Sequence, residues 1–143
     1  MKIVSHIARV LLGLIFTVFG LNGFLHFIPL PLPSGVAGQF MGAVFASHYY
    51  VAVFAVQVAG GILLLSDRYV PLALALLGPV IVNILLFHAL MAPDGLPMAV
   101  IVAALWSVLF SRLRPAFAGL FQQKLESQAL AEPMGVTALS RAR

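Results

Sequence analysis

The sequence predicts an all-α membrane protein, a four-helix transmembrane bundle with both chain ends in the cytoplasm (N-in/C-in). Hydrophobic residues make up 62% of the 143 residues and charged residues only 8%, whereas a soluble domain carries about 25% charged residues. Four long apolar runs are visible: Ile7–Ile28, a run ending at Leu65, Val70–Met91 and Leu96–Phe110. The longest can cross a hydrocarbon core of about 30 Å as helices.

The distribution of Lys and Arg predicts the orientation of these spans. The positive residues lie near the first run, between the second and third, and after the fourth: Lys2, Arg9, Arg68, Arg112, Arg114, Lys124, Arg141 and Arg143. The connections 29–49 and 92–95 contain none. Because cytoplasmic loops carry the excess of Lys and Arg, both termini are expected inside the cell. Membrane topology therefore accounts for the net charge of +4, and no nucleic-acid partner is expected.

The first span is expected as a helix over Ser5–Phe27, capped by its first residue. Pro29 should end it, because proline lacks an amide hydrogen and disfavours helical geometry in the residue before it. Gly13 and Gly20 lie on one stripe, where a neighbouring helix backbone can approach closely. The segment Gly38–Tyr50 is apolar enough to lie in the outer interface or to re-enter the membrane. We interpret it as a short outer-side helix leading into the second span.

The later spans carry their own packing and start signals. Gly60 and Gly61 in the second span allow a close helix contact. Pro71 opens the third helix at a tolerated first-turn position, and Pro79 inside that helix should kink it. Pro97 opens the fourth helix, whose apolar run is short.

A change in composition at Pro115 predicts the division of the chain. The four-span membrane domain covers 1–114, and 115–143 is expected as an amphipathic cytoplasmic helix followed by a flexible tail. That helix would place four apolar residues on one face, Phe117, Leu120, Phe121 and Leu125. Such a face lies on the membrane surface or on a partner.

Five polar side chains within the spans are the candidate ligand-binding residues. They are Asn22 and His26 in the first span, Gln57 in the second, and Asn83 and His88 in the third. The helix rise places the three amides at a common depth in the outer half of the bundle, with both imidazoles above them. Since an unpaired amide in hydrocarbon is costly, we expect all five side chains to converge inside the bundle. Alternatively, the amides only bond across helices and hold the bundle together.

A quinone or a similar lipid-soluble ligand suits these residue types, because its carbonyl oxygens accept hydrogen bonds from His and Asn. Two isolated histidines do not define a ligand set for haem or a metal. The four carboxylates, Asp67, Asp94, Glu126 and Glu132, lie outside the spans, which disfavours proton-coupled transport. The chain has no cysteine and no recognisable catalytic motif. The catalytic residues and the cofactor therefore stay unassigned, and the question of enzymatic activity stays open.

Arg9 and Asp67 are expected to form an ion pair at the cytoplasmic end of the bundle. A charge near the bilayer is held at lowest cost by a partner of opposite sign. The alternative is that Arg9 meets a lipid phosphate instead.

The first span, ARVLLGLIFTVFGLNGF, resembles that of the DoxX-like family of small four-helix bacterial membrane proteins. Arg9, Gly13 and Gly20 match the family's Arg–Gly–Gly pattern, QVAGGILLL matches its second span, and His88 fits near the outer end of the third. Many members have Glu at the position of Gln57. The resemblance implies a multi-pass protein of the bacterial inner membrane and a quinone-linked subunit of a redox or respiratory complex. Its partners would be other membrane subunits or further copies of itself, and related branches are accessory or assembly factors.

Overall fold

Residues 2–118 are described by the structure, a computed structural model in which every regular element of this range is helical. The elements are α1 (Lys2–Leu25), α2 (Gly35–Ala46), α3 (Tyr49–Leu65), α4 (Val70–Leu90), the 3-10 turn η1 (Pro93–Gly95) and α5 (Leu96–Phe117). The predicted all-α class is confirmed for this part of the chain. The expected tail and most of the expected amphipathic helix, including Leu120, Phe121 and Leu125, lie outside the described residues.

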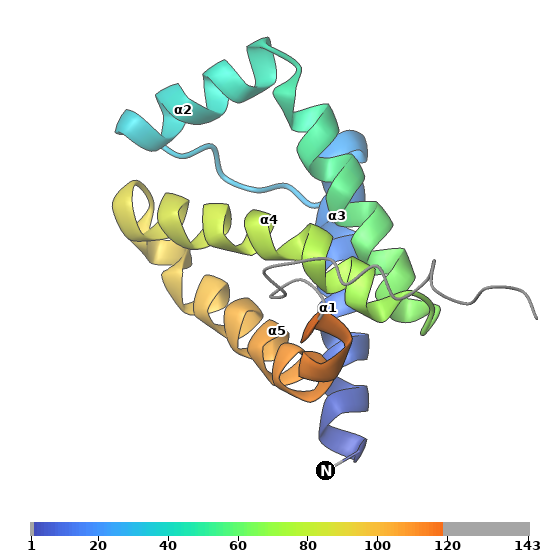
Figure 1. Ribbon diagram of the computed structural model, residues 1–143. Coiled ribbons are helices and arrows are strands. Elements are labelled where there is room, and N and C mark those ends of the chain that lie inside the picture. The colour runs from blue at the N-terminus through green and yellow to red at the C-terminus, as the bar shows by residue number, and fades with distance from the viewer. Residues whose placement is uncertain (1, 119–143) are drawn as a thin grey trace, which may run out of the picture.

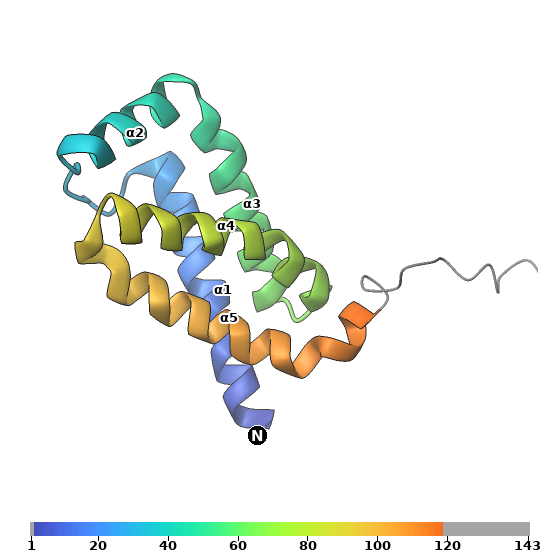
Figure 2. The same ribbon diagram turned by 60° about the vertical axis from the view of Figure 1, so that its left-hand side comes forward.

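Four of the helices form a bundle, and α2 lies at its side, where it contacts α3 and where Phe40 packs against Phe87 of α4. In the bundle α1 contacts α3 and α5, and α4 contacts α3 and α5, so that the four helices close a ring of neighbours. The α4–α5 pair crosses α1 and α3 obliquely, while α2 reaches sideways from the top of α3 (Figures 1 and 2). The side chains at the centre are fully buried: Leu12, Phe16, Leu64, Leu74 and Leu77.

Three to four segments are long and apolar enough to span a membrane. Three qualify alone, over Ile3–Leu25, Val70–Leu90 and Pro93–Phe117. The fourth qualifies if α2 and α3, which meet at 88°, count together as one bent span. Length and composition thus agree with the predicted multi-pass architecture.

Glycines bring the backbones of α1 and α3 together. A Cβ atom on Gly61 of α3 would lie 2.9 Å from the carbonyl oxygen of Gly13, and a Cβ on Gly20 would lie 3.1 Å from the amide nitrogen of Val58. Real Cβ atoms tolerate neither distance without movement of the neighbouring backbone. Gly60 faces the other way, towards α4. The paired glycines therefore let α3 pack closely on both neighbours.

The boundaries of α1 differ from the expected Ser5–Phe27. The helix already includes Lys2, so Ser5 lies inside it and is not the N-cap. At the other end the helix stops at Leu25, before Pro29 can act, because His26 adopts a left-handed backbone conformation with φ of 52°.

The outer connection contains the expected short helix, shifted along the chain. The prediction placed it over Gly38–Tyr50, whereas α2 begins at Gly35 and ends at Ala46. A left-handed residue, His48 with φ of 59°, then turns the chain by 88° into α3. The backbone at His48 and not the apolar pattern therefore decides where α2 ends.

Two helices contain internal prolines, of which Pro79 was expected to kink its helix and Pro115 to begin a new one. Pro79 lies inside α4, which remains a single helix over Val70–Leu90. Pro115, the expected start of a separate amphipathic helix, lies inside α5. The last residue of α5, Phe117, is only 6% exposed, and its ring centroid lies 5.0 Å from that of Phe110. Burial of Phe117 within the bundle thus extends α5 beyond the expected end of its apolar run.

Candidate functional site

The five predicted ligand-binding residues do not converge in one site. Asn22 and Gln57 are buried, with 6% and 7% of their surface exposed, and His88 is partly buried. His26 and Asn83 are exposed. The predicted convergence is therefore wrong, since two of the five side chains lie on the surface of the bundle.

Asn22 closes the C-terminal end of α1. Its side-chain amide Nδ2 donates to the carbonyl oxygen of Ile28 at 3.2 Å, and the backbone N–H of Ile28 donates to Asn22 Oδ1 at 2.6 Å. The backbone N–H of His26 also donates to the carbonyl oxygen of Asn22 at 2.9 Å. The buried amide thus satisfies backbone groups left free where the helix ends.

His88 closes the turn between α4 and α5. Its Nδ1 lies 3.0 Å from the carbonyl oxygen of Ala92, and because a carbonyl only accepts, Nδ1 is the donor. The imidazole also packs on Gly95, where any Cβ atom would overlap the ring. His88 therefore acts as a turn residue, as Asn22 does at the end of α1.

An aromatic cluster surrounds the place where α1, α2 and α3 meet. Its rings are those of Phe24, Phe45, Tyr50 and Phe54, with His26 and His48 at the edges. Phe45 and Tyr50 stack at a centroid distance of 4.8 Å, and His26 lies 6.3 Å from Phe45. The sequence analysis missed this cluster; the four-residue spacing of Tyr50 and Phe54 on one helix face was its signal.

Two polar side chains lie at the contact between α1 and α3. Gln57 faces Gly20, where an added Cβ would lie 3.1 Å from the glutamine Cβ, and no hydrogen bond joins its side chain to other described residues. The Thr17 hydroxyl is buried without a hydrogen-bond partner in the described part of the chain, next to Gly61. Both positions belong to the close packing of the two helices.

Asn83 lies in the C-terminal half of α4 and is exposed on the surface of the bundle. It stands in a row of exposed apolar residues one helical turn apart, Leu76, Pro79, Leu86 and Leu90. Within residues 2–118 the structure gives its amide no hydrogen bond. An amide with unused donors and acceptors therefore lies on the apolar outer surface of a helix long enough to span a membrane.

Trp106 joins the two helices of the second half of the bundle. Its indole Nε1 donates to the carbonyl oxygen of Leu74 at 3.0 Å, and its ring stacks on Phe110 with centroids 4.8 Å apart. Gly78 lies beside the indole, where a Cβ would make an ordinary van der Waals contact at 3.5 Å. This hydrogen bond was not predicted from the sequence.

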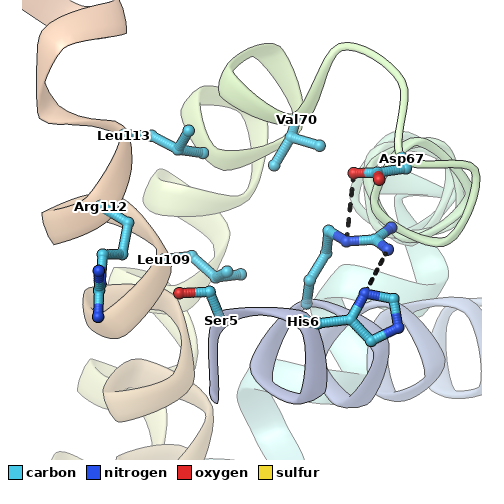
Figure 3. A pocket seen from close by; sticks show the side chains of 8 residues that line it. Ser5, His6, Asp67, Val70, Leu109, Arg112 and Leu113 are labelled. Atoms are coloured by element: carbon cyan, nitrogen blue, oxygen red, sulfur yellow. Dashed lines mark hydrogen bonds and ion pairs between the residues drawn. The ribbon is translucent and has the colours of Figure 1, made fainter. Parts of the chain in front are cut away.

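Charged residues meet at the end of the bundle where α1 begins and α5 ends. The expected ion pair is confirmed: Arg9 Nε lies 3.3 Å from Asp67 Oδ1, although Arg9 is only 8% exposed. The same guanidinium donates through Nη1 to the carbonyl oxygen of Leu64 and through Nη2 to His6 Nδ1, at 3.2 Å in the latter case (Figure 3). Since arginine has no acceptor, His6 Nδ1 carries no proton in this contact.

A cavity of about 240 Å³ opens beside this ion pair. Its lining comes from α1, α5, the first residue of α4 and the connection between α3 and α4: Ser5, His6, Arg9, Asp67, Val70, Leu109, Arg112 and Leu113. This cavity was not predicted from the sequence. Its signal was the presence of arginines near the ends of two helices, α1 and α5, that pack together in the fold.

Residues 2–118 contain no group of three His, Cys, Asp or Glu side chains placed to hold a metal ion. In comparisons with known proteins, the chain matches no family model, no curated protein and no solved structure. The class that the fold supports is a helical protein with three to four candidate membrane spans.

Proposed function

We propose that the protein is a non-catalytic accessory protein of the bacterial inner membrane, whose α4 binds a second membrane helix. The observation that carries this proposal is the exposed amide of Asn83. The α4 segment has a mean hydropathy of 2.4, and an amide facing lipid there would have no partner. Burying a polar group without a hydrogen bond costs several kcal/mol in hydrocarbon, about 4–8 on the scale that allows no compensation.

A helix from a second copy of the chain fits this surface. The asparagine side chain carries both hydrogen-bond donors and an acceptor. Two copies of Asn83 can therefore hydrogen-bond to each other across a two-fold axis. Hydrogen bonds of this kind between membrane helices contribute about 0.6 kcal/mol on average and up to about 1.7 kcal/mol. The exposed leucines on either side of Asn83 supply the apolar contact.

The other polar residues support a structural role for the bundle. Asn22 and His88 close the ends of α1 and α4, and Trp106 ties α5 to α4. This use of polar side chains favours a structural role over a ligand site. Arg9 and Arg112 share one end of the bundle, which the positive-inside rule assigns to the cytoplasm.

Disulfide crosslinking in native membranes tests the proposal, because the chain has no cysteine of its own. Leu86→Cys places one thiol on the α4 face beside Asn83, and Ile101→Cys places one on α5 as the control. The two positions are matched, with 53% and 52% of their surface exposed.

We expect oxidation to give a dimer with Leu86→Cys and none with Ile101→Cys. Adding Asn83→Leu should reduce the dimer, and adding Asn83→Gln, which keeps an amide, should reduce it less. Equal crosslinking at both positions, or none at Leu86→Cys, contradicts the proposal. A crosslinked species of another mass would identify a different membrane protein as the partner of α4.

A quinone-binding subunit of a redox complex is a second candidate, favoured by the aromatic cluster at the outer end. The exposed imidazole of His26 lies at the edge of this cluster and can donate to a carbonyl oxygen, while Phe45 and Tyr50 offer faces for a ring. Organic-solvent extraction of protein purified in native lipid, followed by mass spectrometry, tests it. Stoichiometric quinone in the wild-type extract that is lost in His26→Ala supports this candidate function. The absence of quinone from the wild-type extract contradicts it.

A further inference from the structure

We propose that the cavity between the start of α1 and the end of α5 binds the phosphate group of an anionic phospholipid. The cavity lies where helices of membrane-spanning length end, and lipid headgroups occupy that level of a bilayer. The site is separate from the α4 surface and from the aromatic cluster.

The charges around the cavity favour an anion. Arg9 and Asp67 compensate each other as an ion pair, and Arg9 is further engaged by Leu64 and His6. Arg112 stands on the opposite wall, on α5, and makes no ion pair with another described residue (Figure 3). One guanidinium without a carboxylate partner among the described residues therefore lines the edge of the cavity, and guanidinium groups bind phosphate through paired N–H donors.

The polar lining supplies further contacts for a phosphate. The hydroxyl of Ser5 lies between Arg112 and the Arg9 ion pair (Figure 3). His6 accepts from Arg9 at Nδ1 and so helps to hold the Arg9 side chain in place. Ser5 comes from α1 and Arg112 from α5, so an anion between the two helices would contact both.

The remaining wall is apolar and favours a lipid over a free anion. Val70, Leu109 and Leu113 line this side, and they match the glycerol and upper acyl carbons of a phospholipid. The positive-inside rule places this end at the cytoplasmic leaflet, whose anionic lipids attract basic residues by about 1 kcal/mol each. Inorganic phosphate shares the headgroup chemistry but would leave the apolar wall unused.

The test measures lipid retention by the whole protein in detergent, using native mass spectrometry with added phosphatidylglycerol or phosphatidylcholine. Arg112→Gln removes the free cation, and Arg114→Gln is the control. Arg114 is also exposed near the end of α5 but does not line the cavity, since residues two apart on a helix face different directions. Arg112 makes no hydrogen bond or ion pair with another residue of the range 2–118. Its replacement should therefore leave the fold intact, and circular dichroism checks this.

We expect the wild-type protein to retain phosphatidylglycerol in preference to phosphatidylcholine. Arg112→Gln should lower that preference about fivefold, the effect of one basic residue near an anionic surface, and Arg114→Gln should leave it unchanged. Equal retention of the two lipids overturns the proposal. So does an equal loss in both variants, or the displacement of phosphatidylglycerol by millimolar inorganic phosphate.

Discussion

The buried amide of Asn22 holds the backbone of Ile28 by two hydrogen bonds, one of 2.6 Å to its N–H and one of 3.2 Å to its carbonyl oxygen. This pair turns the chain at the end of α1 and sends it along the outer surface towards α2. A side chain that the sequence suggested as part of a ligand site thus acts as the end of a helix.

Replacing Asn22 by leucine should destabilise the protein by about 2 kcal/mol, since each of the two hydrogen bonds contributes about 1 kcal/mol. Thermal unfolding in detergent measures the effect. Gln39→Leu is the control, because that amide on α2 is exposed and makes no hydrogen bond within the described chain. Equal stability losses in the two variants would contradict the assigned role of Asn22.

Arg9 should matter more than the carboxylate with which it pairs. Asp67 is 68% exposed at its side chain, and exposed ion pairs contribute about 0–1 kcal/mol, so Asp67→Asn should have a small effect. Arg9→Met also removes the bonds to Leu64 and His6, and hydrogen bonds from a charged group contribute about 1.5–3 kcal/mol. Urea or SDS unfolding curves compare the variants. A larger loss for Asp67→Asn would show that the ion pair dominates.

Gly61→Ala should force α1 and α3 apart, at a cost of about 1–3 kcal/mol. The new methyl group would lie 2.9 Å from the Gly13 carbonyl oxygen and 2.7 Å from the Thr17 amide nitrogen. Gly42→Ala provides the control, because nothing lies within 4 Å of a Cβ at that position of α2. That change should be neutral or stabilise α2 slightly, by up to about 1 kcal/mol from helix propensity. Thermal unfolding of both variants checks the contrast.

Trp106→Phe should lower stability by about 1 kcal/mol, the contribution of one hydrogen bond to the Leu74 carbonyl oxygen. Phenylalanine preserves the stacking on Phe110, so packing alone would predict a smaller loss. Because Trp106 is the single tryptophan of the chain, circular dichroism and not fluorescence must follow unfolding of this variant. An unchanged midpoint would show that the hydrogen bond between α4 and α5 contributes no stability.

The sequence by itself determined the helical class and the apolar segments, which follow from local chemistry. It also predicted the pairing of Arg9 with Asp67 as one of two alternatives, and the structure shows that pair. In a bilayer every backbone N–H and C=O group must be hydrogen-bonded within a helix. Two opposite charges near the edge of the bilayer attract each other and are held at lowest cost as a pair. The glycine stripe of α1 was visible for the same reason, since small residues mark the places where membrane helices approach closely.

Only the tertiary structure decided which way each polar side chain points. In a soluble helix the polar face marks the outside, whereas both faces of a membrane helix are apolar and carry no such mark. Asn22 and Asn83 are therefore indistinguishable by pattern, yet one is buried at a helix end and the other faces outward. The bond of Trp106 to α4 and the cavity beside Arg112 likewise depend on contacts between distant segments, which no local pattern encodes.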